Sequence, residues 1–186
     1  MFFDMVRTDP AAFAAFVFGA TCLVIWPMFK SHRMMLFVQM GIGVGFGAHY
    51  ALEHHPTAAA QNLLGMLQIA CVLALGAGKA RHVGFLIIAA MLASGVLTWE
   101  GNVSILSTVG TLLISGGRMR ADGRSMKCVV LAGLGFWVWH DLVVTSIVVF
   151  ADLFSIIVGA ITLLPDAKLQ FHTLGRLKTY KETRQI

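Results

Sequence analysis

The chain has 186 residues, of which 58% are hydrophobic and 12% are charged, and its mean hydropathy is +0.79. One soluble core of this size cannot bury so many apolar side chains, so the composition excludes an ordinary soluble domain and predicts a lipid-facing surface. The formal net charge of +5 does not indicate nucleic-acid binding, because the basic residues lie between apolar runs and in the tail. The three cysteines, Cys22, Cys71 and Cys128, argue by their odd number and apolar surroundings against a disulfide framework.

Seven apolar runs follow one another along the chain, and each is expected to be a helix because lipid offers no partner for a bare backbone. They extend over about 11–29, 34–52, 57–77, 83–99, 103–115, 127–139 and 143–164. Turn signals, including Gly116-Gly-Arg118 and Asp141, separate the runs. The first run is too long for the core of a signal peptide and should remain in the mature protein. The predicted fold is an all-α membrane protein with seven transmembrane helices.

The positions of lysine and arginine predict the orientation, because these residues accumulate on the cytoplasmic side of a membrane. All of them except Arg7 follow the first, third, fifth and seventh runs, whereas the opposite loops carry acidic residues, namely Glu53, Glu100 and Asp141. We therefore expect a multi-pass protein of the bacterial inner (plasma) membrane. Residues 1–10 would lie outside, and residues 165–186 would form a basic cytoplasmic tail drawn to anionic lipid.

An internal repeat emerges when the chain is shifted on itself by 91 residues, which aligns the first three runs with the last three. The matched pairs include His49 with His140, Gly19 with Gly110, and Phe46 with Trp137. The predicted organisation is a first three-helix repeat over 11–77, a linker helix over 83–99 and a second repeat over 103–164. The linker lets both repeats insert in the same orientation, and such a parallel repeat places a substrate site near the midplane.

Two motifs in the first repeat carry a resemblance to a known superfamily. They are Phe46-Gly-Ala-His-Tyr50 and Gln61-Asn-Leu-Leu-Gly65, which are similar to the second-helix aromatic motif and third-helix Asn-x-x-Gly motif of the SWEET and PQ-loop superfamily. In its sugar-transporting members an asparagine and a tryptophan form the pocket, which implies that role for Asn62 and Trp137. The Pro-Gln pair that names the PQ-loop group is absent, and Leu153 stands opposite Asn62 in the repeat.

The second repeat resembles a narrower family. Ser125-Met-Lys-Cys-Val129, Phe136-Trp-Val-Trp-His140 and the polar last run are similar to the YgjV-type bacterial inner-membrane proteins. This resemblance covers most of the chain, and Trp-x-x-His is its most specific element.

Ionisable groups deep in a bilayer are functional candidates, because each costs several kcal/mol unless it is neutralised, paired or hydrated. Asp152 lies among apolar neighbours in the last run and is the first candidate for proton coupling; a structural aspartate bonded to a neighbouring helix is the alternative. His140 is the second such candidate. His140 and His49 are also candidates for binding a substrate, although a ring at the membrane interface needs no further role.

Four further residues are candidates for contacting a substrate. Gln61 and Asn62 carry amides that can bind a ligand or join helices together. Phe46 and Trp137 offer an aromatic wall on which a sugar, nucleoside or vitamin ring can stack. For Trp139 and Trp99, anchoring at the membrane interface explains the indole ring at least as well as a substrate contact does.

The expected function is a small-solute transporter or facilitator that works by alternating access on a sugar-, vitamin- or metabolite-like substrate, with or without proton coupling. No nucleophile elbow, phosphate loop or zinc-protease motif occurs, so an enzyme is the poorest explanation and no cofactor is expected. The alternative is a non-transporting scaffold or sensor with a basic cytoplasmic face, and metal binding through His49, His140 and Asp152 is a third hypothesis. The expected partners are the lipid bilayer and a small-molecule substrate, without nucleic acid, and a homo-oligomer stays open.

Overall fold

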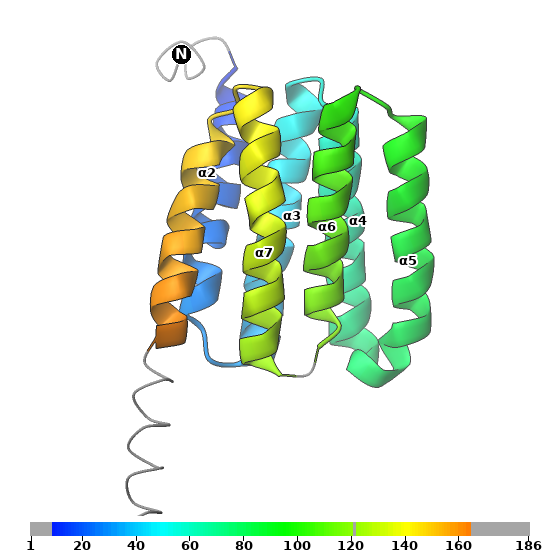
Figure 1. Cartoon of the computed structure of the whole chain (residues 1–186), viewed down its shortest axis with the longest axis vertical. Helices are drawn as coiled ribbons and strands as arrows, with labels where there is room; N and C mark the ends of the chain where they lie inside the picture. Colours follow the sequence, from blue (N-terminus) through cyan, green and yellow to red (C-terminus); the bar gives the residue numbers. More distant parts are fainter. Residues whose placement is uncertain (1–8, 121, 165–186) are drawn as a thin grey trace, which may run out of the picture.

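The computed structural model describes residues 9–120 and 122–164, in which helices stand side by side in one bundle (Figure 1). These residues form seven α-helices and contain no strand. The helices are α2 (Pro10–Ile25), α3 (His32–Leu52), α4 (Pro56–Leu75), α5 (Ala77–Leu97), α6 (Asn102–Arg118), α7 (Gly123–Val143) and a last helix, Val148–Leu164, drawn in orange; the short 3-10 helix η1 (Trp26–Met28) follows α2. The all-helical prediction is thus confirmed, while Arg7 and the basic tail lie outside the described residues.

Two of the predicted turns are wrong, because α6 and α7 are longer than their apolar runs. Helix α7 begins at Gly123, where the Asp122 carboxylate accepts a hydrogen bond of 2.7 Å from the backbone N–H of Ser125. It continues to Val143, so Asp141 lies inside the helix and not in an outer loop. Helix α6 likewise continues through Gly116-Gly-Arg118. Apolar runs underestimate these helices because their end turns carry polar side chains that point into the bundle.

Four helical segments are long and apolar enough to cross a membrane: Pro10–Met28, His32–Leu52, Pro56–Leu75 and Gly123–Val143. Two shorter apolar helices, His82–Leu97 and Val148–Leu164, accompany them. Large apolar side chains such as Phe18, Phe37 and Leu86 are exposed on the outside of the bundle, as lipid contact requires. For the remaining three helices, a membrane-spanning role stays a prediction.

The turn after α3 recurs after α7 in the same register. His54 and Thr145, which are 91 positions apart, are the described non-glycine residues with a positive φ, at 62° and 55°. Each turn is closed by a backbone hydrogen bond of 3.0 Å, from Glu53 to His49 in the first and from Val144 to His140 in the second. The same local geometry therefore follows both helices.

A glycine-to-aromatic contact also recurs at this offset. A Cβ atom on Gly19 of α2 would lie 2.6 Å from the Phe46 ring of α3, and one on Gly110 of α6 would lie 2.8 Å from the Trp137 ring of α7. Both glycines are needed because an aromatic side chain occupies the space beside them. Helices α2 and α3 thus pack through the same pair of positions as α6 and α7.

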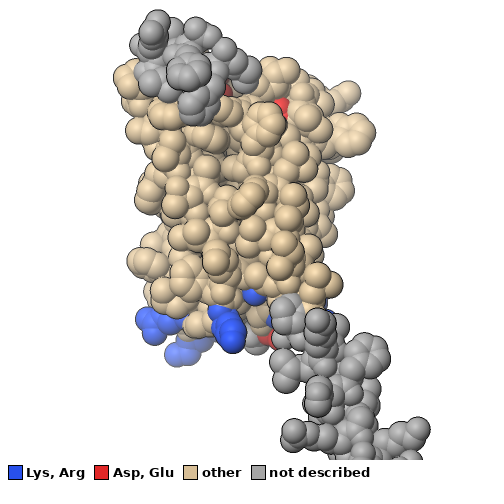
Figure 2. All heavy atoms as spheres, turned by 90° about the vertical axis from the view of Figure 1, so that its left-hand side faces the viewer, with Lys and Arg blue, Asp and Glu red and all other residues tan. Residues whose placement is uncertain are grey.

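Exposed basic side chains lie at one end of the bundle. Figure 2 shows lysine and arginine gathered there, and the exposed ones include Lys30, Arg33, Lys79, Arg120 and Arg124. Arg118 is the exception among the residues that we expected there, because it is buried inside the bundle. Its position at a predicted turn was misleading, since its side chain continues the inward face of α6.

Candidate functional site

A cavity of about 50 Å³ lies inside the bundle, and every described helix except α5 contributes to its wall. Its polar lining consists of Gln39, Tyr50, Gln61, Asn62, Thr111, Arg118 and Asp152. Its apolar lining consists of Leu23, Trp26, Ile42, Phe46, Gly65, Ile114, Val130, Leu134, Trp137 and Val148. This volume has room for a few water molecules or a group of a few heavy atoms.

The cavity brings together five of the residues that we predicted for the site. Phe46, Gln61, Asn62, Trp137 and Asp152 all line it, although they come from four different helices. The Trp137 ring stacks on the Tyr50 ring of α3, with ring centroids 5.8 Å apart. The predicted aromatic wall and the predicted amides therefore face the same space.

The side-chain amides of Gln61 and Asn62 differ in the hydrogen bonds that they form. The side-chain nitrogen of Gln61 donates to the carbonyl oxygen of Met91 at 2.8 Å and to the hydroxyl of Ser94 at 3.1 Å, which ties α4 to α5. The side-chain oxygen of Gln61 is buried and has no partner among the described residues. Asn62 donates to the carbonyl of Ala58 one turn earlier at 3.0 Å. Gln61 therefore joins helices and keeps one acceptor unused beside the cavity.

Asp141 forms the centre of a buried polar cluster near one end of the cavity. Tyr50 donates its hydroxyl to Asp141 Oδ1 at 2.6 Å, and His140 Nδ1 lies 2.9 Å from the same oxygen, which accepts from it. The carboxyl group of Asp152 lies close enough to that of Asp141 for their charges to interact, while the Oδ2 atoms of both residues have no hydrogen-bond partner among the described residues. All four side chains are at most 2% exposed. Two buried carboxylates this close repel each other unless one of them is protonated, so this cluster can hold and release a proton.

The two predicted histidines do not line the cavity. His49 donates through Nδ1 to the carbonyl oxygen of Ala12 at 3.1 Å, and its Nε2 lies 3.5 Å from a Glu53 oxygen. His140 lies behind the cavity wall, where its ring contacts those of Tyr50 and Trp137 at centroid distances of 5.9 and 5.2 Å. Within residues 9–120 and 122–164, no three histidine, cysteine or acidic side chains come together in a way that could hold a metal ion.

Arg118 brings a positive charge to the cavity from the end of α6. Its Nε donates to the Gln39 side-chain oxygen at 2.8 Å, and one terminal nitrogen donates to the Gly65 carbonyl oxygen at 3.3 Å. Gly65 makes room for this nitrogen, since a Cβ atom there would lie 2.8 Å from it. The side chain is only 7% exposed. A guanidinium stays protonated in proteins, so the cavity wall carries a buried cation.

Helices α4 and α6 meet through a ladder of polar side chains. Thr57, Gln61 and Gln68 of α4 contact Ser104, Thr108 and Ser115 of α6, and each pair is separated by 47 positions. A constant offset means that the two helices run parallel and in register. These contacts explain why α6 is polar although it lies inside the bundle.

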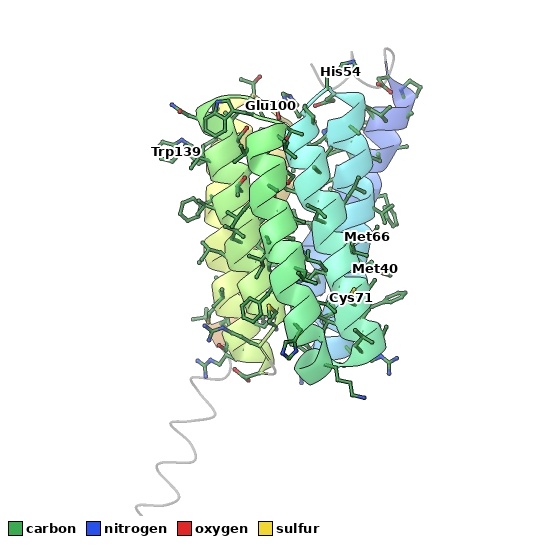
Figure 3. The ribbon with its side chains drawn as sticks, turned by 90° about the vertical axis from the view of Figure 1, so that its right-hand side faces the viewer. Met40, His54, Met66, Cys71, Glu100 and Trp139 are labelled. Atoms are coloured by element: carbon green, nitrogen blue, oxygen red, sulfur yellow. The ribbon has the colours of Figure 1, made fainter. Side chains whose placement is uncertain are left out.

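Trp139 behaves differently from its neighbour Trp137. Its side chain is 64% exposed, and Figure 3 shows it pointing away from the helices near the end of the bundle where Glu100 lies. An indole ring in this position is suited to the membrane interface. The interfacial interpretation therefore fits Trp139, whereas Trp137 faces the cavity.

Comparison with known families agrees with a helical bundle that is apolar outside. The sequence model of Imp-YgjV, described as bacterial inner membrane protein, matches residues 11–169. The chain belongs to the Imp-YgjV family. No curated protein and no solved structure matches it. The family places this protein in the bacterial inner membrane. Its activity has to be inferred from the geometry of the cavity.

Sequence reasoning missed three site residues of this Imp-YgjV protein: Tyr50, Arg118 and Asp141. The sequence contained a signal for Arg118 in its helical spacing and a signal for Asp141 in the 91-residue offset. Arg118 continues the inward polar stripe of α6 at the i, i+3, i+4 spacing, after Thr111 and Ser115. Asp141 stands 91 positions after Tyr50, so the two partners of one hydrogen bond occupy equivalent positions in the repeat.

Proposed function

We propose that this protein is a small-solute transporter of the inner membrane that works by alternating access. The observation that carries the proposal is the polar cavity, which lies inside a bundle with an apolar exterior and is lined by Gln39, Gln61, Arg118 and Asp152. Buried polar and charged groups are costly in a membrane and usually mark a solute pathway. In alternating access, such a cavity would hold the solute between the two halves, and an occluded state would close it at both ends.

The proposed architecture is a parallel three-plus-one-plus-three repeat of the SWEET type, in which the two halves move against each other around the cavity. Two features support it: the turns at His54 and Thr145 are alike, and the Gly19–Phe46 contact recurs as Gly110–Trp137. Helix α5 contributes no side chain to the cavity and lies at the edge of the bundle in Figure 1, as a linker should. The hydrogen bond from Tyr50 to Asp141 would join the two halves in the occluded state.

Proton coupling would use the pair of carboxyl groups formed by Asp141 and Asp152. The pair would hold one proton while the two groups lie close together, because two adjacent buried carboxylates repel each other strongly. When the halves separate, water reaches the groups and the proton leaves. Asp152 is the member that lines the cavity, so it would link the proton to the solute.

The orientation would place the N-terminus outside and the C-terminus in the cytoplasm. The gathering of exposed lysine and arginine at one end of the bundle supports this assignment, since that end would face the cytoplasm (Figure 2). A cysteine introduced at Lys79 should react with an impermeant maleimide only after cells are opened. Labelling in intact cells would contradict the orientation without affecting the transport proposal.

The proposed function is tested by solute flux into proteoliposomes, with labelled glucose, uridine, alanine and acetate as probes and with an imposed pH gradient. We expect at least one probe to enter faster than in empty liposomes. The Asp152→Asn variant should lose any dependence of that flux on the gradient, whereas Asp152→Glu, which keeps a carboxyl group, should retain it. A flux with an unchanged pH profile in Asp152→Asn would reject the proton-coupling role of this residue.

A non-transporting scaffold or sensor is the second candidate function. The small volume of the cavity favours it, because about 50 Å³ leaves little room for a sugar or a nucleoside. This candidate predicts no flux of any probe through a well-folded protein. It also predicts that Asp152→Asn changes stability alone.

A further inference from the structure

The guanidinium of Arg118 is a buried cation without a counter-ion. Every ion pair among residues 9–120 and 122–164 involves a histidine, and none includes Arg118. The two groups that Arg118 does contact, the Gln39 amide oxygen and the Gly65 carbonyl, are both neutral. An uncompensated charge in a low-dielectric interior costs several kcal/mol, so an arrangement of this kind favours the arrival of an anion.

Arg118 and Gln39 both line the cavity and have N–H donors without a partner. The guanidinium has five N–H groups, and its hydrogen bonds to Gln39 and Gly65 use two of them. The side-chain nitrogen of Gln39 is also buried and has no partner among the described residues, although Gln39 is only 1% exposed and lines the cavity. Arg118 and Gln39 thus present N–H donors without a partner to the cavity. Their one acceptor, the Gln39 side-chain oxygen, is already used by Arg118.

The acidic cluster at Asp141 does not neutralise this charge. Gln39 and Tyr50 are eleven residues apart on α3, which corresponds to about 16 Å along the helix axis. Gln39 holds Arg118, and Tyr50 holds Asp141, so the two charged sites occupy different levels of the bundle. Each site therefore has its own requirement: a proton at the acidic cluster and an anion at Arg118.

We propose that Arg118 and Gln39 bind the carboxylate of a small organic anion in the central cavity. The inference rests on the proposed function, because it names the class of solute that the cavity would take. A planar guanidinium fork matches a carboxylate in a bidentate geometry, which a spherical halide cannot use. The apolar side chains of Ile42, Ile114 and Val130 line the same cavity and would contact the short hydrocarbon part of the solute.

The volume of the cavity sets the size of the solute. About 50 Å³ admits a carboxylate with a very short chain and is too small for a sugar or a nucleotide. Acetate and propionate are therefore suitable probes, and acetamide is a neutral probe of nearly the same shape. A proton released by the acidic cluster during the same cycle would balance the negative charge that the anion carries across the membrane.

The proposal is tested by thermal unfolding of the full-length protein in detergent, at constant ionic strength, with increasing acetate, propionate, acetamide or chloride. We expect acetate and propionate to raise the unfolding temperature saturably, and acetamide and chloride to have no such effect. The Arg118→Gln variant should weaken acetate binding about tenfold or more, since it removes a charge-assisted hydrogen bond. The matched control is Arg120→Gln, because Arg120 is an exposed arginine near the same end of α6 and does not line the cavity.

A second variant keeps the test valid if Arg118→Gln does not fold. Gln39→Glu places a carboxylate where an amide oxygen now lies 2.8 Å from Arg118 Nε, so it supplies the missing counter-ion internally. We expect this variant to remain folded, with unchanged or higher stability, and to lose its response to acetate. An equal acetate response in the wild type, Arg118→Gln and Gln39→Glu would overturn the proposal. An absent response in the wild type, or an equal response to chloride, would also overturn it.

Binding and flux separate this inference from the proposed function. Acetate binding that depends on Arg118, combined with no flux of any probe, would refute transport and leave the anion site standing. Flux of neutral probes without any acetate binding would refute the anion site and leave transport standing.

Discussion

A close backbone contact between α2 and α3 makes a sharp prediction about Gly45 of α3. A Cβ atom at this position would lie 2.5 Å from both the Cα and the backbone nitrogen of Gly19 in α2, and 2.9 Å from the carbonyl oxygen of Ala15. Carbon atoms normally pack at 3.5–4.0 Å. Because the obstructing atoms belong to a backbone, no rotamer change can remove the clash. The Gly45→Ala variant therefore has to push α2 away from α3 by about 1 Å.

The expected cost follows from two opposing contributions. Overpacking a well-filled interior costs about 1–3 kcal/mol, and a rigid backbone obstacle favours the upper limit. Alanine recovers about 1 kcal/mol through its better helix propensity. Gly45→Ala should thus lower the free energy of unfolding by about 2 kcal/mol. Gly135→Ala is the matched control, because Gly135 lies inside α7 with no atom within 4 Å of the added Cβ, and it should gain up to about 1 kcal/mol.

Thermal unfolding of both variants in the same detergent measures this difference. A gap of about 3 kcal/mol corresponds to roughly 6–12 °C between the two unfolding temperatures for a chain of this length. If Gly45→Ala unfolds at the same temperature as Gly135→Ala, or at a higher one, then α2 and α3 do not approach each other as described, and the reasoning is refuted.

Two further variants test the junction between the halves and the repeated turns. Tyr50→Phe removes the donor to Asp141 and should lower the free energy of unfolding by about 1–3 kcal/mol. Thr21→Val removes an exposed hydroxyl and should change that free energy by less than about 0.5 kcal/mol. Equal denaturation midpoints for the two variants would contradict the buried hydrogen bond. Thr145→Gly relieves a β-branched residue at φ 55° and should raise stability by about 1 kcal/mol, measured by thermal unfolding. His54→Gly should gain less, because histidine tolerates this backbone conformation better, and a larger gain at His54 would argue against strain at Thr145.

The buried polar side chains form two sites, an acidic cluster around Asp141 and a cationic site at Arg118. Tyr50 and His140 contact Asp141 through hydrogen bonds and Asp152 lies nearby, whereas Arg118 lacks an acid partner. Both sites face the same small cavity through Asp152 and Arg118. A solute that carries one negative charge and moves together with one proton would satisfy both sites at once.

Much of the candidate site was predictable because each of its polar residues is exceptional in its own helix. Asp152 is conspicuous among valine, phenylalanine and alanine, and the adjacent amides of Gln61 and Asn62 stand out in an apolar run. Phe46 and Trp137 were found through the repeat, which compares positions without any knowledge of contacts. His49 and His140 were found in the same way, yet their rings contact Ala12 and Asp141 beside the cavity and do not line it.

The helical bundle and its apolar exterior were determined by the sequence alone, because lipid forces each long apolar run to satisfy its backbone as a helix. Only the tertiary structure decided which polar side chains meet. Asp141 looked like a loop residue and Arg118 like a topological signal, since hydropathy averages over a run and does not register the direction in which one side chain points. Tyr50 and Asp141 lie 91 positions apart, and their contact depends on the packing of α3 against the second half of the chain. Charge and hydropathy act locally along a helix, whereas a cavity is defined by the faces that several helices turn toward one another.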